Sequence, residues 1–129
     1  MNLRLHIAIV CALGISSSAW ADANRFGDEY APCGQKNSTI EIVECVGALT
    51  AAWDRRLNVA YRELIDDMEP KSRERLRAAQ RLWIQYRDAN CAWYGGGEGT
   101  IARIEAAECL RSMTAARAME LEGEAEPNR

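Results

Sequence analysis

The sequence predicts an all-α fold in which two long helices form an antiparallel hairpin, a third helix packs across it, and two disulfides staple the domain. Three observations support this prediction. Apolar residues recur every three or four positions over long stretches, which is the spacing of one helix face. No stretch alternates apolar and polar residues as a half-buried strand does. Four of the five cysteines lie beyond the N-terminal leader, and an even number is typical of a small exported domain with disulfides.

The N-terminus has the three parts of a secretory signal peptide. Residues 1–6 include the basic Arg4, residues 7–15 are apolar, and residues 19–21 (Ala-Trp-Ala) have the small-x-small pattern that signal peptidase cuts. The apolar stretch is far shorter than the roughly 20 residues that span a bilayer, so a membrane anchor is disfavoured. No cysteine lies at the expected cut, so no lipid anchor is expected either. We therefore predict cleavage after Ala21 and a periplasmic or secreted protein.

Residues 22–37 contain two glycines and Pro32 and lack a helical period, so we expect an irregular lead-in. A helical domain follows over residues 38–121. Ser38 and Glu41 have the spacing of a capping box, which predicts that the first helix begins after Ser38. Its apolar face consists of Ile42, Val46, Leu49, Trp53, Leu57, Ala60, Tyr61, Leu64 and Met68. A helix of this length fits a compact domain only if other long helices lie beside it.

A second helix is expected over Pro70–Tyr94, because proline suits the first helical turn, where its missing N–H has no partner to lose. Its main face consists of Leu76, Ala79, Gln80, Trp83, Arg87, Asn90, Cys91 and Tyr94. A second apolar stripe consists of Leu82, Tyr86 and Trp93. Apolar residues on two sides predict that this helix is the central element of the three-helix packing.

Residues 95–99 contain four glycines, which supply a flexible backbone for a sharp connection. A phosphate-binding loop is disfavoured, because neither a preceding strand nor a Lys-Ser or Lys-Thr pair is present. Thr100 can cap a third helix that reaches Leu121. The predicted inner face of this helix consists of Ala102, Ala106, Cys109, Met113 and Ala116. Residues 122–129 are polar and include Pro127, so we expect a disordered tail.

The cysteines beyond the leader are Cys33, Cys45, Cys91 and Cys109. A Cys33–Cys45 bond would fold the lead-in onto the first helix, and a Cys91–Cys109 bond would join the second and third helices. We favour these local pairs, although four cysteines allow three connectivities and the other two stay open. A zinc site is disfavoured because no two of these cysteines are close in sequence and no histidine accompanies them.

Composition excludes several classes of function. His6 is the only histidine and lies in the leader, so the mature chain cannot use Ser-His-Asp or Cys-His catalysis or a histidine-bound metal. The leader carries Arg4 and no acidic residue, so cleavage makes the net charge one unit more negative than the −3 of the full chain. This charge disfavours nucleic acid and anionic membranes as partners and permits a cationic protein. No cofactor is predicted.

Acidic pairs are the remaining candidates for catalysis, since glycoside hydrolysis uses two facing carboxylates. Asp66 with Asp67, and Glu105 with Glu108, are such pairs, but solvent-exposed helix faces explain them more simply. Aromatic side chains could stack on sugars, although at helical spacing such residues are more often part of the core. These aromatic residues are Trp53, Trp83, Tyr86, Trp93 and Tyr94.

Gln80, Arg87 and Asn90 are polar residues on a face that otherwise resembles a core. Burying them without partners would be costly. One interpretation is a buried network, in which Arg87 binds a carboxylate such as Asp54 or Asp88 and Gln80 binds a backbone group. The other is a polar cleft between helices. We favour the network, because buried polar groups are usually satisfied within the fold.

One longer pattern runs from Cys33 to Leu121. Its residues are Cys33, Glu41, Cys45, Trp53-Asp54, Leu57-Asn58, Tyr61, Leu64, Leu76, Ala79-Gln80-Arg81, Trp83-Ile84, Tyr86-Arg87-Asp88, Cys91, a Gly-rich turn, Cys109, Thr114, Arg117 and Leu121. This pattern resembles the N-terminal domain family of the lysozyme inhibitor LprI, a group of small exported bacterial proteins. The resemblance implies a helical, disulfide-bonded domain in the periplasm or at the envelope that binds and inhibits lysozyme.

The candidate partner-binding or motif residues are Gln80, Trp83, Tyr86, Arg87, Asp88 and Glu98. Glu98 belongs to this set because the Gly95–Thr100 loop lies at the tip of a helix pair and could enter the cleft of a lysozyme, although a plain turn is the simpler interpretation. Two other functions stay open. An envelope interaction module with a different partner would show an exposed apolar patch outside the packing faces. A carboxylate-based cell-wall hydrolase would show two acids facing each other in a cleft.

Overall fold

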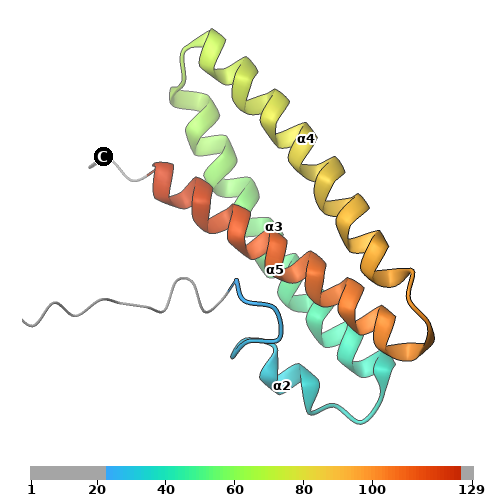
Figure 1. The fold of residues 1–129 in the computed structure, drawn as a ribbon. Helices are drawn as coiled ribbons and strands as arrows, with labels where there is room; N and C mark the ends of the chain where they lie inside the picture. The colour runs from blue at the N-terminus through green and yellow to red at the C-terminus, as the bar shows by residue number, and fades with distance from the viewer. Residues whose placement is uncertain (1–22, 126–129) are drawn as a thin grey trace, which may run out of the picture.

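A computed structural model describes residues 23–125, which form a short helix and three long ones (Figure 1). The helices are α2 (Ala31–Gly34), α3 (Thr39–Asp67), α4 (Pro70–Gly95) and α5 (Gly99–Ala125). Within this described part no residue is in a strand, and the all-α prediction is confirmed. The predicted signal peptide lies outside the described residues. The predicted lead-in contains the short helix α2. The sequence predicted a disordered tail from residue 122, but residues 122–125 continue α5.

Local chemistry sets the ends of the long helices. The Ser38 Oγ accepts a hydrogen bond from the Glu41 backbone N–H at 3.2 Å and donates one to the Glu41 carboxylate at 2.9 Å, which caps α3. Pro70 opens α4 at the first helical position. Gly99 begins α5 with a φ of +78°, a conformation that glycine adopts without steric cost. The predicted boundaries of the long helices are therefore close to the observed ones.

The central helix of the domain is α5, not α4 as the sequence suggested. Figure 1 shows α3 and α4 as an antiparallel hairpin, with α5 returning along it, and α5 packs closely against both of the other long helices. Small residues along α5, including Ala102, Ala115 and Ala118, are fully buried and let its neighbours approach from more than one side. In α4 only Gln80 and Cys91 are buried to this degree.

The hydrophobic core lies between α3 and α5. Trp53, Leu57 and Ala60 of α3 pack against residues of α5. Their buried partners on α5 are Ala115, Ala118 and Leu121. From α4, Leu76 and Trp83 cover the edge of this cluster and stay partly exposed. Burial of a leucine or similar side chain contributes about 1.5–3 kcal/mol, so this cluster is a major source of stability.

Both predicted disulfides are confirmed. Cys33 of α2 is bonded to Cys45 of α3 with a Cα–Cα distance of 5.5 Å. Cys91 of α4 is bonded to Cys109 of α5 with a Cα–Cα distance of 5.4 Å. Each bond contributes about 2–4 kcal/mol by restricting the unfolded chain. Across residues 23–125, no helix carries an apolar stretch long enough to cross a membrane.

Candidate partner-binding surface

The inner face of α4 holds three of the candidate residues in a structural network. Gln80 is buried, and its Oε1 accepts a hydrogen bond from the Arg117 Nε of α5 at 3.0 Å. The predicted bond from Gln80 to a backbone group is therefore wrong, because α5 brings a guanidinium to this position. Trp83 and Arg87 are partly buried, and the Arg87 guanidinium carbon lies 5.0 Å from the centre of the Trp83 indole.

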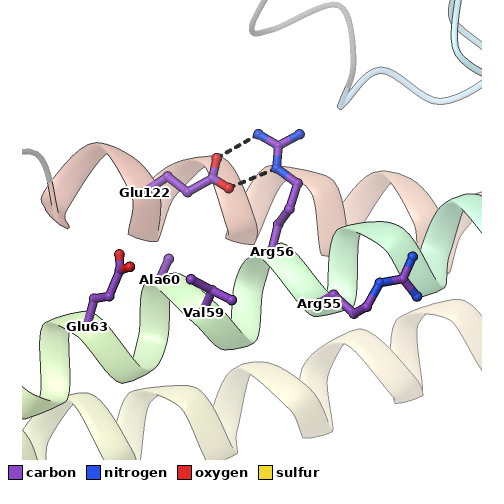
Figure 2. A pocket seen from close by; sticks show the side chains of 6 residues that line it. All are labelled: Arg55, Arg56, Val59, Ala60, Glu63 and Glu122. Carbon is purple, nitrogen blue, oxygen red and sulfur yellow. Dashed lines mark hydrogen bonds and ion pairs between the residues drawn. The ribbon is translucent and has the colours of Figure 1, made fainter.

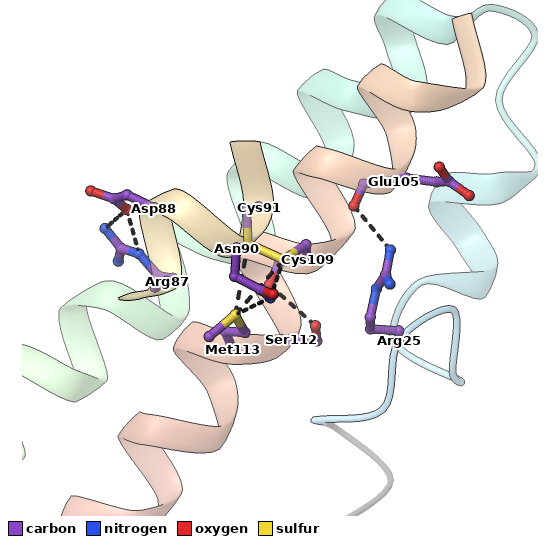
Figure 3. Close-up of a disulfide and its surroundings, with 9 residues drawn as sticks. All are labelled: Arg25, Arg87, Asp88, Asn90, Cys91, Glu105, Cys109, Ser112 and Met113. Atoms are coloured by element: carbon purple, nitrogen blue, oxygen red, sulfur yellow. Dashed lines mark hydrogen bonds and ion pairs between the residues drawn. A yellow bond between two sulfur atoms is a disulfide. The ribbon is translucent and has the colours of Figure 1, made fainter. Parts of the chain in front are cut away.

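Arg87 pairs with its neighbour Asp88 and not with Asp54. The Arg87 Nε and Nη2 donate to the Asp88 Oδ1 at 2.9 and 2.7 Å. Figure 3 shows this pair directed away from the disulfide between α4 and α5. Beside the disulfide, the Asn90 Nδ2 lies 3.3 Å from the Met113 Sδ. Gln80, Arg87 and Asn90 thus each have a partner within the fold, although the Arg87–Asp88 pair lies at the surface.

A shallow recess of about 360 Å³ does open between α3 and α4. Its lining residues are Asn58, Tyr61, Arg77, Gln80, Arg81 and Ile84. A second recess of about 310 Å³ lies beside α3 and α5, where Arg56 donates to Glu122 through Nε and Nη2 at 2.9 and 2.8 Å (Figure 2). This ion pair ties α3 to α5, and the recess is also lined by Arg55, Val59, Ala60 and Glu63.

The outer face of α4 is exposed, although the sequence predicted a second core stripe there. Leu82, Tyr86 and Trp93 are 65, 63 and 73% exposed. The prediction fails because α5 packs on one side of α4 only, and no other described element covers the opposite side. An apolar stripe outside the packing faces is therefore present, and it includes Tyr86 from the candidate set.

Glu98 is exposed in the short turn between α4 and α5. The loop is shorter than the predicted Gly95–Thr100 loop, because α4 ends at Gly95 and α5 begins at Gly99. A third recess of about 450 Å³ lies at this end of the molecule. It is lined by Trp93, Tyr94, Gly96, Gly97 and Glu105. The turn, the recess and the exposed Trp93 together form one end of the helix hairpin, which we call the α4–α5 tip.

Sequence reasoning missed a buried ion cluster centred on Arg111 of α5. Arg111 and Glu108 are both 0% exposed. The Arg111 Nε donates to the Glu108 Oε2 at 2.8 Å, and its Nη2 donates to the Asn24 carbonyl at 2.6 Å. The Arg111 Nη1 donates to Glu29 of the N-terminal segment. Burial lowers the pKa of Arg111, but the hydrogen bonds and charges of Glu108 and Glu29 outweigh this effect, so its pKa is raised overall.

This cluster holds the segment before α2 against the helices. The Phe26 backbone N–H donates to the Glu108 Oε1 at 2.9 Å, and the Trp53 Nε1 donates to the Glu29 carboxylate at 2.9 Å. Glu108, expected on a solvent-exposed face, is instead completely buried and cannot contact a polysaccharide. The spacing of Glu108 and Arg111 suits an ion pair on a helix, but such pairs usually lie on the surface, so the sequence carried no sign of burial.

Comparison with known proteins decides the family. A sequence model of the lysozyme inhibitor LprI matches residues 31–121. The chain belongs to the LprI family. The matched region contains both disulfides of this LprI-family protein and most of its three long helices, and it leaves out Asn24 and Glu29 of the buried cluster. No curated protein and no solved structure matches the chain. In residues 23–125, no group of three or more His, Cys, Asp or Glu side chains is placed to hold a metal ion.

Proposed function

We propose that this LprI-family protein binds lysozyme and inhibits it in the periplasm or outside the cell. The observation that carries the proposal is the family match over residues 31–121. Two disulfides support an oxidising compartment. A formal net charge of −3 supports association with lysozymes of the animal type, which are cationic, because charge complementarity speeds encounter.

The exposed members of the candidate set are the ones that a partner can reach. Tyr86, Asp88 and Glu98 are exposed, whereas Gln80 is buried and Arg87 is paired with Asp88. We therefore assign Gln80 and Trp83 a supporting role, in which they hold α4 against α5 and the core, and we assign Arg87 a supporting role beside the Trp83 ring. We propose that Glu98 and the neighbouring Trp93 at the α4–α5 tip contact the enzyme, since both side chains are exposed at the end of the helix hairpin.

Inhibition of cell-wall lysis tests this function. The exported, oxidised protein is titrated against an animal-type and a bacterial-type lysozyme, and the clearing of a cell-wall suspension is followed. We expect slowing at micromolar inhibitor. Unslowed clearing by both enzymes at that concentration would reject the proposal.

Variants of the tip test the contact residues. Glu98→Gln and Trp93→Ala are compared with Glu63→Gln, which removes an exposed charge near the C-terminal end of α3, at the opposite end of the antiparallel hairpin from the tip. We expect the tip variants to weaken inhibition and the control to inhibit as the unmodified protein does. If all the variants inhibit equally, the tip is not the contact surface.

An envelope interaction module with another partner is the second candidate, and the exposed stripe of α4 favours it. The lysis assay separates the two, because such a module would leave clearing unchanged. In the same assay, clearing by the protein alone would reveal a hydrolase.

A further inference from the structure

The outer face of α4 has the spacing of a coiled-coil seam. Its positions step alternately by four and three residues, so that they stay on one line along the helix. These positions are Arg75, Ala79, Leu82, Tyr86, Ala89 and Trp93, and all of them are exposed. Single exposed apolar residues are ordinary on a protein surface, but a row that keeps this period over about five turns is not.

Within the fold, the Trp93 ring makes an edge contact with Tyr94, but no other described helix covers the row. The opposite side of α4 carries the contacts to α5, through the Gln80–Arg117 hydrogen bond and the Cys91–Cys109 disulfide. A helix that needed only to be soluble on its outer face would favour charged residues there. The row therefore indicates a second helix that the described chain does not provide.

We propose that the row is covered by a second copy of this chain, with the two α4 helices packed antiparallel and Leu82 of each opposite Tyr86 of the other. This self-association does not rest on the proposed inhibition of lysozyme, but both use the exposed Trp93, so a dimer and a lysozyme complex would compete for this side chain.

Side-chain sizes fit this register. If Leu82 lies opposite Tyr86, the same alignment places Ala79 opposite Ala89 and Arg75 opposite Trp93. Large residues then meet at the centre, and small residues flank them where the helices must approach closely. At each end a guanidinium can stack on an exposed indole, which is a favourable cation–π contact.

Charge determines the direction of the pair. The first half of α4 is basic, with one acidic residue, Glu74, among its cations. These cations are Lys71, Arg73, Arg75, Arg77 and Arg81. A parallel pair would set Arg75 against Arg75 and align two basic halves, which repel each other. An antiparallel pair instead brings each basic half to the carbonyl end of the other helix, whose last turn has no basic residue of its own.

A seam of one helix is smaller than the roughly 800 Å² per partner of a standard stable interface. We therefore expect a reversible dimer with a dissociation constant on the order of micromolar. An anionic membrane surface is the competing occupant, because it also attracts basic and aromatic side chains. The row is narrow, and the acidic Glu74 and Asp88 lie beside it. An anionic lipid surface would repel these two carboxylates, so a second helix is the better occupant.

Sedimentation equilibrium of the exported, oxidised protein tests the dimer. We expect an average mass that rises with concentration and a dissociation constant at least about tenfold weaker for Leu82→Glu. Ile40→Glu is the matched control, because Ile40 is 62% exposed in the first turn of α3, outside the row. It should associate as the unmodified protein does. A monomer at every concentration up to millimolar, or unimpaired association of Leu82→Glu, would overturn the proposal.

Cysteine cross-linking tests the direction. In the antiparallel register, a mixture of Ala79→Cys and Ala89→Cys chains forms mixed disulfides, while each variant alone does not, because equivalent residues lie about 15 Å apart along the axis. In a parallel pair each variant would cross-link with itself and the mixed disulfide would not form, and this result would contradict the proposed register. Gly47→Cys, at an exposed position with open space around it, measures bonding by random collision. Equal cross-linking of all variants, or binding to anionic vesicles by a protein that stays monomeric, would also refute the dimer.

Discussion

Replacing Arg111 by methionine would leave Glu108 buried without its cation. Both side chains are 0% exposed, and Arg111 binds Glu108 through two of its nitrogens at 2.8 and 2.6 Å. Removing one partner of a buried ion pair costs about 3–5 kcal/mol, because the remaining charge stays desolvated. Glu29 is partly exposed and water can solvate it, so we take about 4 kcal/mol as the expected loss.

Urea unfolding followed by far-ultraviolet circular dichroism measures this loss. With an m-value of about 2 kcal/mol per M, the unfolding midpoint of Arg111→Met should fall by about 2 M. Arg103→Met is the matched control, because Arg103 lies on the same helix and is exposed. Its unfolding free energy should change by less than about 0.5 kcal/mol.

The double variant Glu108→Met/Arg111→Met separates the charge from the side chains. It leaves no unpaired charge at Glu108, although the Phe26 N–H and the Asn24 carbonyl still lose their partners. We expect a loss of about 2 kcal/mol, smaller than that of Arg111→Met alone. A loss below about 1 kcal/mol for the single variant, or an equal or larger loss for the double one, would refute the reasoning.

Three further predictions concern stability. Burial, and then the charge of Glu108, raise the pKa of Tyr30 above its usual 10.0, so the folded state holds this proton more tightly than the unfolded state does. The resulting stability is present below pH 10 and is lost as the pH rises through the pKa of Tyr30 in the folded state. The unfolding free energy of Tyr30→Phe should therefore fall less steeply with pH in that range than that of the unmodified protein. Cys91→Ser/Cys109→Ser should lose about 2–4 kcal/mol in chemical unfolding, and the effect of a reductant on the variant should be smaller than on the unmodified protein. Leu57→Ala should lose about 2–5 kcal/mol, whereas Val59→Ala at an exposed position of α3 should change little, and equal losses in thermal or urea unfolding would contradict the assigned core.

The helices and their ends could be predicted because they depend on near neighbours. The capping pair Ser38 and Glu41 lies within one turn, and Pro70 acts on its own backbone. The disulfides could also be predicted, since two helices joined by a short turn bring Cys91 near Cys109. The candidate set mixed exposed and buried residues, because a sequence period shows which residues share a face and not whether that face is covered.

By itself, the sequence determined an all-α chain with three long helices and its family, and it favoured the two local disulfides that the structure confirms. Tertiary structure decided which faces are buried. It placed α5 at the centre, left Leu82, Tyr86 and Trp93 of α4 exposed, and enclosed Glu108 and Arg111 beside Glu29. The physical reason is that helical period and capping are local, whereas burial depends on the neighbour that a face meets, and residues far apart along the chain choose that neighbour.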